Sequence, residues 1–260
     1  MAERHTTSVK PRPGFPARLG PNPAPKPLTP VLRHGTPHAP AGLGMDSSAV
    51  RRSMVTKLAQ QGIADQQVLS AMGSVERHRF VDSALVNQAY EDTSLPIGLG
   101  QTISKPGVVS RMLELLRQGT AGRLGRVLEI GTGCGYQAAV LSHLCTEVYS
   151  IERLRGLHDK ARDNLRHLRL ANVHLLFGDG MAGYARGAPY AGIIAAAGGE
   201  AIPACWLEQL AVGGRLVAPV AAGAHSPGRQ ALMVVDKTAQ GFRHTVMEAV
   251  HFVPLKSGVA

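Results

Sequence analysis

Short apolar runs separated by helix-like segments dominate the middle of the chain. Strands are expected where aliphatic and β-branched residues cluster, at 127–130, 147–151, 173–177 and 191–195. The segments between these runs carry apolar residues at helical spacing and predict helices. Strands that alternate with helices form a mostly parallel sheet, so the pattern predicts an α/β fold.

The last part of the chain breaks this alternation. A strand at 215–219 is followed by strands at 231–236 and 245–252, with no helix between them. Consecutive strands without a crossover helix pair in antiparallel fashion. The pattern therefore predicts a mostly parallel sheet with an antiparallel edge.

Residues 46–105 predict a helical addition in front of the sheet. One helix is expected to begin at Asp46 or Ser47, and a second has Asp65 as its N-cap. The charged turn that ends at Phe80 is expected to be solvated, with only Phe80 in the core.

Residues 90–106 predict a loop that packs on the domain, because glycines and prolines interrupt an alternating apolar pattern. Ser104 is expected to cap the helix that follows, which has Pro106 in its first turn. The start of a helix also offers unpaired N–H groups, so this end can bind an anion such as a carboxylate.

Composition separates a tail from a folded domain. The first 45 residues hold ten of the 17 prolines, and six Lys or Arg against one Glu. Such a segment buries too little apolar surface to offset its ordering entropy. We predict a disordered basic tail at 1–45 and one domain at 46–260. Within the domain we expect the helical addition and loop at 46–105, a ligand-binding core at 106–220 and the final strands at 221–260.

The net charge of +10 makes nucleic-acid binding a hypothesis to weigh. Half of this excess lies in the tail, and the domain has no dense basic block with interleaved aromatics, so we expect no specific nucleic-acid partner. No apolar run is long enough to span a membrane, and we expect no membrane partner. Three widely spaced cysteines match no zinc pattern, which predicts a cytoplasmic protein without a metal. We expect a monomer.

The stretch RVLEIGTGCGY, at Arg126–Tyr136, carries the clearest chemical signal. A buried strand ends in three glycines at alternate positions from Gly131 and continues into a helix, as in nucleotide-binding folds. The dinucleotide fingerprint G-x-G-x-x-G needs its third glycine where Tyr136 stands, which disfavours NAD. The spacing G-x-G-x-G after the acidic Glu129 resembles that of S-adenosylmethionine-dependent methyltransferases.

Two acids stand where ligand-binding carboxylates are expected. Glu152 follows the next strand, 21 residues after Gly131, close to the offset of a ribose-binding acid. Asp179 lies in a Gly-Asp-Gly turn after the third strand and borders the ligand crevice. In the methyltransferases that the chain resembles, an acid at this position contacts adenine.

Taken in order, further stretches resemble the protein-L-isoaspartate O-methyltransferase family over about 45–257. The most specific stretch is the loop LPIGLGQTISKP, which methyltransferases in general do not share. The matching stretches are QGIAD (61–65), RHRFV (77–81), LPIGLGQTISKP (95–106), VLEIGTGCGYQAAVLS (127–142), IER (151–153), GDG (178–180), LEQLAVGGRLVAPV (207–220) and FVPL (252–255).

The resemblance implies a Rossmann-like S-adenosylmethionine-dependent methyltransferase fold with added N-terminal helices. It implies that Ser104 is the active-site serine and that Thr102, Ile103 and Ser104 contact the substrate. The implied cofactor-binding residues are Glu129, Gly131, Thr132, Gly133, Gly135, Tyr136, Glu152, Asp179 and Gly180.

The implied reaction is methyl transfer from S-adenosylmethionine to isoaspartyl residues of damaged proteins and peptides, which initiates their repair. Three positions depart from the family pattern: Lys105 stands for Gln, Tyr190 for Asp, and 197–199 for a proline-bearing stretch. A methyltransferase for another acceptor and a non-catalytic S-adenosylmethionine-binding protein remain alternatives.

Overall fold

The computed structural model describes residues 48–222 and 229–260. The chain divides into two units, Met1–Ala39 and Pro40–Ala260, and every described residue belongs to the second. The tail that we predict at 1–45 lies outside the described residues.

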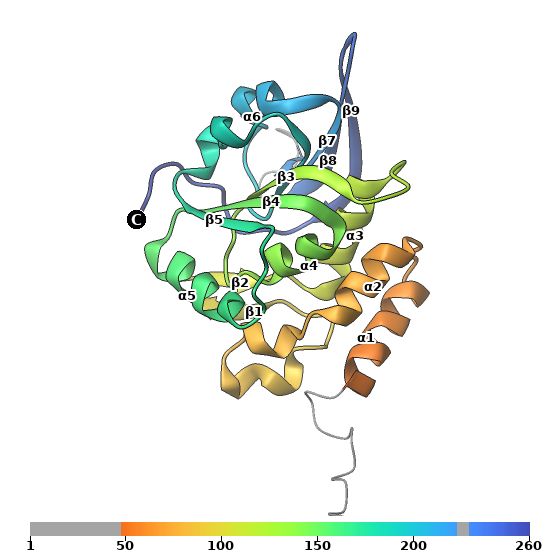
Figure 1. The fold of residues 1–260 in the computed structure, drawn as a ribbon, viewed down its shortest axis with the longest axis vertical. Coiled ribbons are helices and arrows are strands. Elements are labelled where there is room, and N and C mark those ends of the chain that lie inside the picture. Colours follow the sequence, from red (N-terminus) through yellow and green to blue (C-terminus); the bar gives the residue numbers. More distant parts are fainter. Residues whose placement is uncertain (1–47, 223–228) are drawn as a thin grey trace, which may run out of the picture. The chain divides into compact units, whose positions relative to one another are not determined.

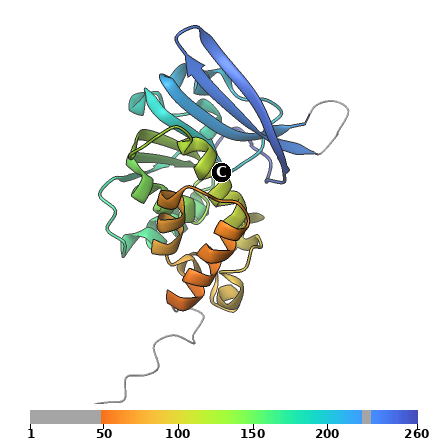
Figure 2. The ribbon, with the colours of Figure 1, turned by 90° about the vertical axis from the view of Figure 1, so that its right-hand side faces the viewer.

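Among the described residues, seven strands form the main sheet in the order β5-β4-β3-β6-β7-β8-β9 (Figure 1). The pairings among the first five strands of this order are parallel, whereas β8 pairs antiparallel with both of its neighbours. This confirms a mostly parallel sheet with an antiparallel edge, which Figure 2 shows as the blue strands. The strands are β3 (Leu124–Ile130), β4 (Cys145–Glu152), β5 (Val173–Phe177), β6 (Tyr190–Ala195), β7 (Leu210–Ala221), β8 (Gln230–Thr238) and β9 (Gly241–Val250).

Helices cover both faces of this sheet. One apolar cluster contains residues of α3 (Pro106–Arg117), α4 (Tyr136–Leu144) and α5 (Arg155–Arg166). The other contains Trp206 of α6 (Ala204–Gln209), on the opposite face in Figure 1. The chain leaves β3 in one direction to β4 and returns on its other side as β6, so a ligand crevice is expected at the carboxyl end of β3.

Two helices, α1 (Ser48–Gln60) and α2 (Gln66–Ser74), precede the sheet. The Asp65 carboxylate accepts hydrogen bonds from the backbone N–H groups of Gln67 and Val68, at 2.8 and 3.2 Å, which confirms the predicted N-cap. The start that we expect for the first helix, at Asp46 or Ser47, lies outside the described residues. None of the helices described is long and apolar enough to cross a membrane.

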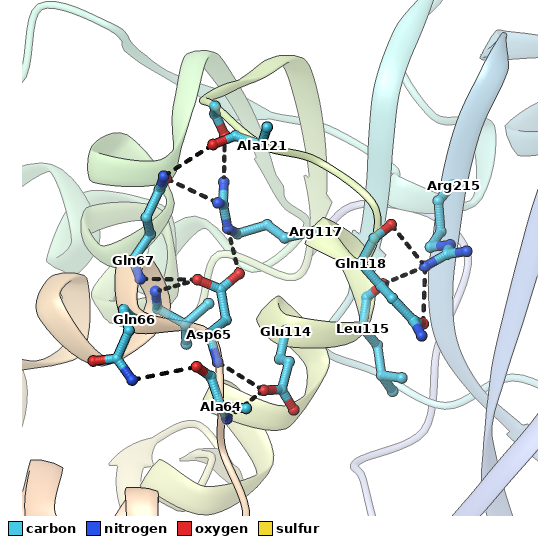
Figure 3. A network of polar contacts seen from close by, with 12 residues as sticks. Ala64, Asp65, Gln66, Gln67, Glu114, Leu115, Arg117, Gln118, Ala121 and Arg215 are labelled. Carbon is cyan, nitrogen blue, oxygen red and sulfur yellow. Dashed lines mark hydrogen bonds and ion pairs between the residues drawn. The ribbon is translucent and has the colours of Figure 1, made fainter.

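A polar network joins α2 to α3 (Figure 3). The Arg117 Nε atom donates to Asp65 at 2.9 Å, and Glu114 accepts from the backbone N–H groups of Ala64 and Asp65 at 2.6 and 3.0 Å. At the end of α3, Arg215 of β7 donates to the Leu115 carbonyl at 2.9 Å. These contacts fix α3 and thereby the loop that leads into it.

The turn from Arg77 to Phe80 is less solvated than we expected. Phe80 is buried, as predicted, but Arg77 is also fully buried. Its Nε atom donates to the Ala89 carbonyl at 2.8 Å, and its guanidinium lies 4.8 Å from the centroid of the Tyr136 ring. A carbonyl acceptor and an aromatic face compensate part of the loss of water around this cation, whose two terminal nitrogens are buried without a hydrogen-bond partner among the described residues. The expectation of a solvated turn was therefore wrong for Arg77.

The predicted loop at 90–106 contains a small antiparallel hairpin, β1 (Leu95–Gly98) and β2 (Gln101–Ile103). Its turn holds Gly98 and Gly100 at φ +97° and +68°, a region that glycine enters without strain. Leu95, Ile97 and Ile103 are buried, so the alternating apolar residues that we noted do belong to a strand pair. The hairpin delivers Ser104 to the start of α3.

Candidate functional site

The glycine turn lies at the carboxyl end of β3, where the fold predicts a ligand. Gly131, Gly133 and Gly135 have φ values of +90°, +57° and +90°, which side-chain-bearing residues rarely adopt. The backbone N–H groups of Gly131 and Thr132 donate to the Ile151 carbonyl at 2.9 and 3.1 Å. The turn is therefore held against the end of β4.

Glu152, at the end of β4, completes this arrangement. Its two carboxylate oxygens accept from the backbone N–H groups of Gly133 and Leu154, each at 2.9 Å. The side chain is almost buried, at 5% exposure, and lines a cavity beside the turn. An ionised carboxylate has about four acceptor positions. Glu152 can therefore bind two more donors, such as the hydroxyls of a ribose.

The cavity has a volume of about 250 Å³ and is lined by segments that are distant in the sequence. They are the hairpin loop at 97–104, the glycine turn, the end of β4, and residues 253–256. Nine of the predicted site residues line it, namely Thr102, Ile103, Ser104, Gly131, Thr132, Gly133, Tyr136, Glu152 and Gly180. A Cβ atom on Gly180 would come within 2.6 Å of the Ile130 side chain, so this wall requires glycine.

Two other predicted cofactor residues lie behind the cavity wall. Gly135 starts α4, and a Cβ atom there would lie 3.1 Å from Leu165. Glu129 is fully buried and accepts a hydrogen bond from the Ser150 hydroxyl, which also lies 2.6 Å from the Thr132 hydroxyl. Burial raises the pKa of Glu129 to about 8. Both residues support the turn from behind, so a direct contact with a cofactor stays a prediction.

Asp179 lies beside the cavity with its carboxylate turned to the backbone. Its Oδ1 atom accepts from the Met181 N–H at 2.8 Å and its Oδ2 atom from the Gly258 N–H at 2.7 Å. The second contact comes from residues 256–260, which we call the clasp segment. A contact of Asp179 with adenine therefore stays a prediction, one that requires Asp179 to share its carboxylate with the clasp segment.

The clasp segment is held along the end of β4. Arg153 Nε donates to the Gly258 carbonyl at 2.8 Å. The Ala260 N–H donates to the Arg153 carbonyl at 2.9 Å, and the Arg155 N–H donates to the Ala260 carbonyl at 2.7 Å. Of this segment, Lys256 lines the cavity. Sequence reasoning missed the clasp segment, because these contacts join residues about 100 positions apart and leave no local pattern.

A second, larger hollow lies on the other side of the hairpin loop. This groove has a volume of about 840 Å³ and runs between α3 and β9. It shares Thr102, Ser104, Ala196 and Val253 with the cavity. The loop at 102–104 therefore separates two adjoining spaces and faces both.

Ser104 itself does not cap α3 as we expected. Lys105 occupies the N-cap position without a side-chain hydrogen bond, and the Gly107 N–H donates instead to Asp92 Oδ1 at 2.7 Å. Asp92 reaches this N–H because glycine leaves room for it. A Cβ atom on Gly107 would lie 2.9 Å from Oδ1. Within the described residues, the Ser104 hydroxyl makes no hydrogen bond and is available to a ligand.

Other reactive groups are scattered. No three His, Cys, Asp or Glu side chains gather as a metal site in the part of the chain that the structure describes. The three cysteines are free, and burial raises the pKa of the Cys134 thiol to about 11. Cys134 therefore stays protonated at neutral pH and fits the tight turn as a small residue.

Comparisons with known proteins agree with this geometry. Residues 49–260 match the family model for protein-L-isoaspartate(D-aspartate) O-methyltransferase. A protein-L-isoaspartate O-methyltransferase of Methylibium petroleiphilum is 55% identical over 96% of this chain and 97% of its own length. A protein-L-isoaspartate O-methyltransferase of Leptothrix cholodnii is 58% identical over 85% of this chain and 78% of its own length.

Solved structures show the same fold. A protein-L-isoaspartate O-methyltransferase superposes with a TM-score of 0.72 at 26% identity, over 81% of this chain and 67% of that one. A Plasmodium falciparum chain, solved in complex with S-adenosyl-L-homocysteine, superposes with a TM-score of 0.69 at 22% identity, over 79% of this chain and 98% of that one. This agreement confirms the Rossmann-like methyltransferase fold that the sequence predicts.

Proposed function

Since the chain belongs to the protein-L-isoaspartate(D-aspartate) O-methyltransferase family, we propose that it methylates the free α-carboxyl group of L-isoaspartyl residues in damaged proteins and peptides. S-adenosylmethionine supplies the methyl group, carried on a sulfonium. The observation that supports this proposal most directly is the placement of the 102–104 loop between a nucleoside-sized cavity and a peptide-sized groove.

The residues of the cavity fit an adenosyl ligand. Gly131 and Gly133 let a ligand approach the backbone without a side chain between them. Glu152 retains acceptor positions for ribose hydroxyls. Gly180 adds no side chain to the cavity wall, where a Cβ atom would clash with Ile130. Tyr136 and Thr132 line the same space. These residues, together with Asp179 at the adenine end, would hold the methyl donor.

The acceptor needs positioning and no activation. A carboxyl group with a pKa of about 4 is already ionised at neutral pH, so no general base is required. A carboxylate oxygen forms the new bond to the methyl carbon while the carbon–sulfur bond breaks. Ser104 would orient the carboxylate with its free hydroxyl, next to Thr102 and Ile103. Correct placement of two reactants can lower a barrier by roughly 7–11 kcal/mol.

The methyl ester leads to repair. The backbone nitrogen of the following residue attacks the ester carbonyl, methanol leaves, and a succinimide ring closes. Hydrolysis of the ring then returns part of the chain to the normal aspartyl linkage. This sequence needs no metal ion or further enzyme group, and we propose that the protein works as a monomer in the cytoplasm, without a specific nucleic-acid or membrane partner.

A peptide methylation assay tests the assignment. The protein is incubated with labelled S-adenosylmethionine and a matched pair of peptides that differ only in an isoaspartyl or aspartyl linkage. We expect label in the isoaspartyl peptide alone. Equal labelling of both peptides would point to another acceptor. Cofactor binding without labelling of either would support the non-catalytic alternative.

The Ser104→Ala variant tests the role of the loop. Because no hydrogen bond joins the Ser104 hydroxyl to another described residue, we expect its loss to leave the fold intact. We expect kcat to fall at least tenfold, since one orienting hydrogen bond to a charged group contributes about 1.5–3 kcal/mol. The affinity for S-adenosylhomocysteine, measured by calorimetry, should stay within about twofold. Loss of that affinity would contradict this role.

A further inference from the structure

Lys105 follows Ser104 in the chain and lines the same groove. Its ammonium group lies 3.8 Å from Asp92 Oδ2, which is beyond hydrogen-bond distance. The side chain is 46% exposed and lines the groove together with Asp92, Thr102 and Ser104. Lys105 is thus a half-exposed cation that pairs loosely with Asp92 and keeps N–H donors for a further anion.

The other fixed charges of the groove are already paired. Arg111 contacts Glu248 of β9 at 2.8 Å and Glu114 at 3.0 Å. The Arg111 guanidinium is therefore already paired with two carboxylates. His251 also lines the groove. Among the lysine and arginine side chains described in this groove, Lys105 is the one with capacity to bind a further anion.

Asp92 creates a need for such a cation. Its carboxylate occupies the Gly107 N–H, which is the group at the start of α3 that could otherwise bind an anion. It also places a negative charge on the groove wall shared with Ser104. An anionic acceptor that approaches Ser104 therefore meets repulsion from Asp92 and gains little from the end of the helix.

We propose that Lys105 binds the carboxylate of the acceptor and, with Asp92 holding it at the groove wall, replaces the helix N-terminus as the anion-binding group. This proposal rests on the proposed function, because it concerns the same acceptor. It assigns a substrate-binding role to a residue that departs from the glutamine usual in the resembled family.

The kinetic consequence follows from the charge change in the reaction. The acceptor carboxylate loses its charge as the methyl group is transferred, so a cation beside it stabilises the ground state more than the transition state. Removal of Lys105 should therefore raise KM and leave kcat unchanged or slightly higher. A merely structural residue would lower kcat or the thermal stability instead.

The Lys105→Gln variant tests the proposal. At low salt and pH 8 we expect KM for an isoaspartyl peptide to rise about two- to fivefold, the range of one partly exposed charge pair. The effect should shrink at 0.5 M salt because screening weakens charge interactions. Lys105→Arg should restore most of the affinity. Arg166→Gln, on the exposed face of α5, removes the same charge elsewhere and should leave KM unchanged.

A binding measurement separates this role from turnover. With S-adenosylhomocysteine present, the wild-type protein should bind the isoaspartyl peptide more tightly than its neutral isoasparaginyl counterpart, and Lys105→Gln should lose most of that preference. Asp92→Asn keeps the oxygen that accepts from Gly107 and removes the charge, so in the Lys105→Gln background it should lower KM again.

Two results would overturn the proposal. One is an unchanged KM in Lys105→Gln at low salt, and the other is an equal loss of affinity for the charged and neutral peptides. If the wild-type protein methylates no isoaspartyl peptide, the proposed function fails before Lys105 is tested. The wild-type arm therefore distinguishes the two failures.

Discussion

Glu129 shows how one residue can support a ligand site without facing it. The side chain is fully buried behind the glycine turn, and one of its carboxylate oxygens has no hydrogen-bond partner. Desolvation raises its pKa to about 8 from an ordinary 4.5, against the lowering effect of the hydrogen bond from Ser150. The folded protein therefore keeps a proton that the unfolded chain releases.

This proton makes stability depend on pH. Between about pH 4.5 and 8 the folded state binds one proton more than the unfolded state, so the free energy of unfolding falls as pH rises. Glu129→Gln imitates the protonated form and removes this dependence. We expect its stability relative to wild type to increase from pH 5 to 8, by at most about 1.4 kcal/mol per pH unit.

Urea unfolding of both proteins at several pH values measures this difference, since other titrating groups cancel between them. Above about pH 9 the difference should become constant, because Glu129 is then ionised in both states. A difference that does not change between pH 5 and 8 would show that Glu129 is already ionised in the folded protein at pH 5.

The sequence predicts a helix or strand well where the apolar pattern within that segment is enough to define it. The helix at 136–144 and the strand at 173–177 begin and end where their apolar patterns do. The sequence predicts a loop where the structure has the hairpin within 95–103, because its glycines outweigh a short apolar alternation. Burial of Arg77 and the turn of Asp179 toward Gly258 depend on contacts between distant segments. Local sequence carries no signal for these.

The clasp segment can be tested through Arg153, which also lines the cavity itself. Lys256 lines the cavity, and Arg153 holds the segment through the Gly258 carbonyl at 2.8 Å. Arg153→Ala should loosen this wall and raise KM for S-adenosylmethionine about three- to tenfold with kcat nearly unchanged, as expected for one partly exposed hydrogen bond from a charged group.

Arg155→Ala is the matched control for the clasp segment. The Arg155 side chain pairs with Asp159 at 3.2 Å, and its hydrogen bond to the segment comes from the backbone N–H, which alanine retains. The KM of this variant should therefore equal that of wild type. Tighter cofactor binding in Arg153→Ala would show the opposite role, in which the segment competes with the ligand for Asp179.

At the scale of the whole molecule, the cavity is lined by segments that are distant in the sequence and lie together only in the folded protein. Its walls come from the hairpin loop at 97–104, the glycine turn, the end of β4 and residues 253–256. The unfolded chain has no such site, so a ligand of this cavity binds the folded state selectively. Ligand binding should therefore stabilise the whole described domain.

The size of this stabilisation can be predicted from mass action. S-adenosylhomocysteine at 100 times its Kd should add about 2.7 kcal/mol to the free energy of unfolding. For a domain of about 200 residues this raises Tm by about 5–11 °C. NAD at the same concentration should cause no shift, because Tyr136 stands where the dinucleotide fingerprint needs glycine. Differential scanning calorimetry measures both. An equal shift with NAD would mean that the glycine spacing does not select the ligand.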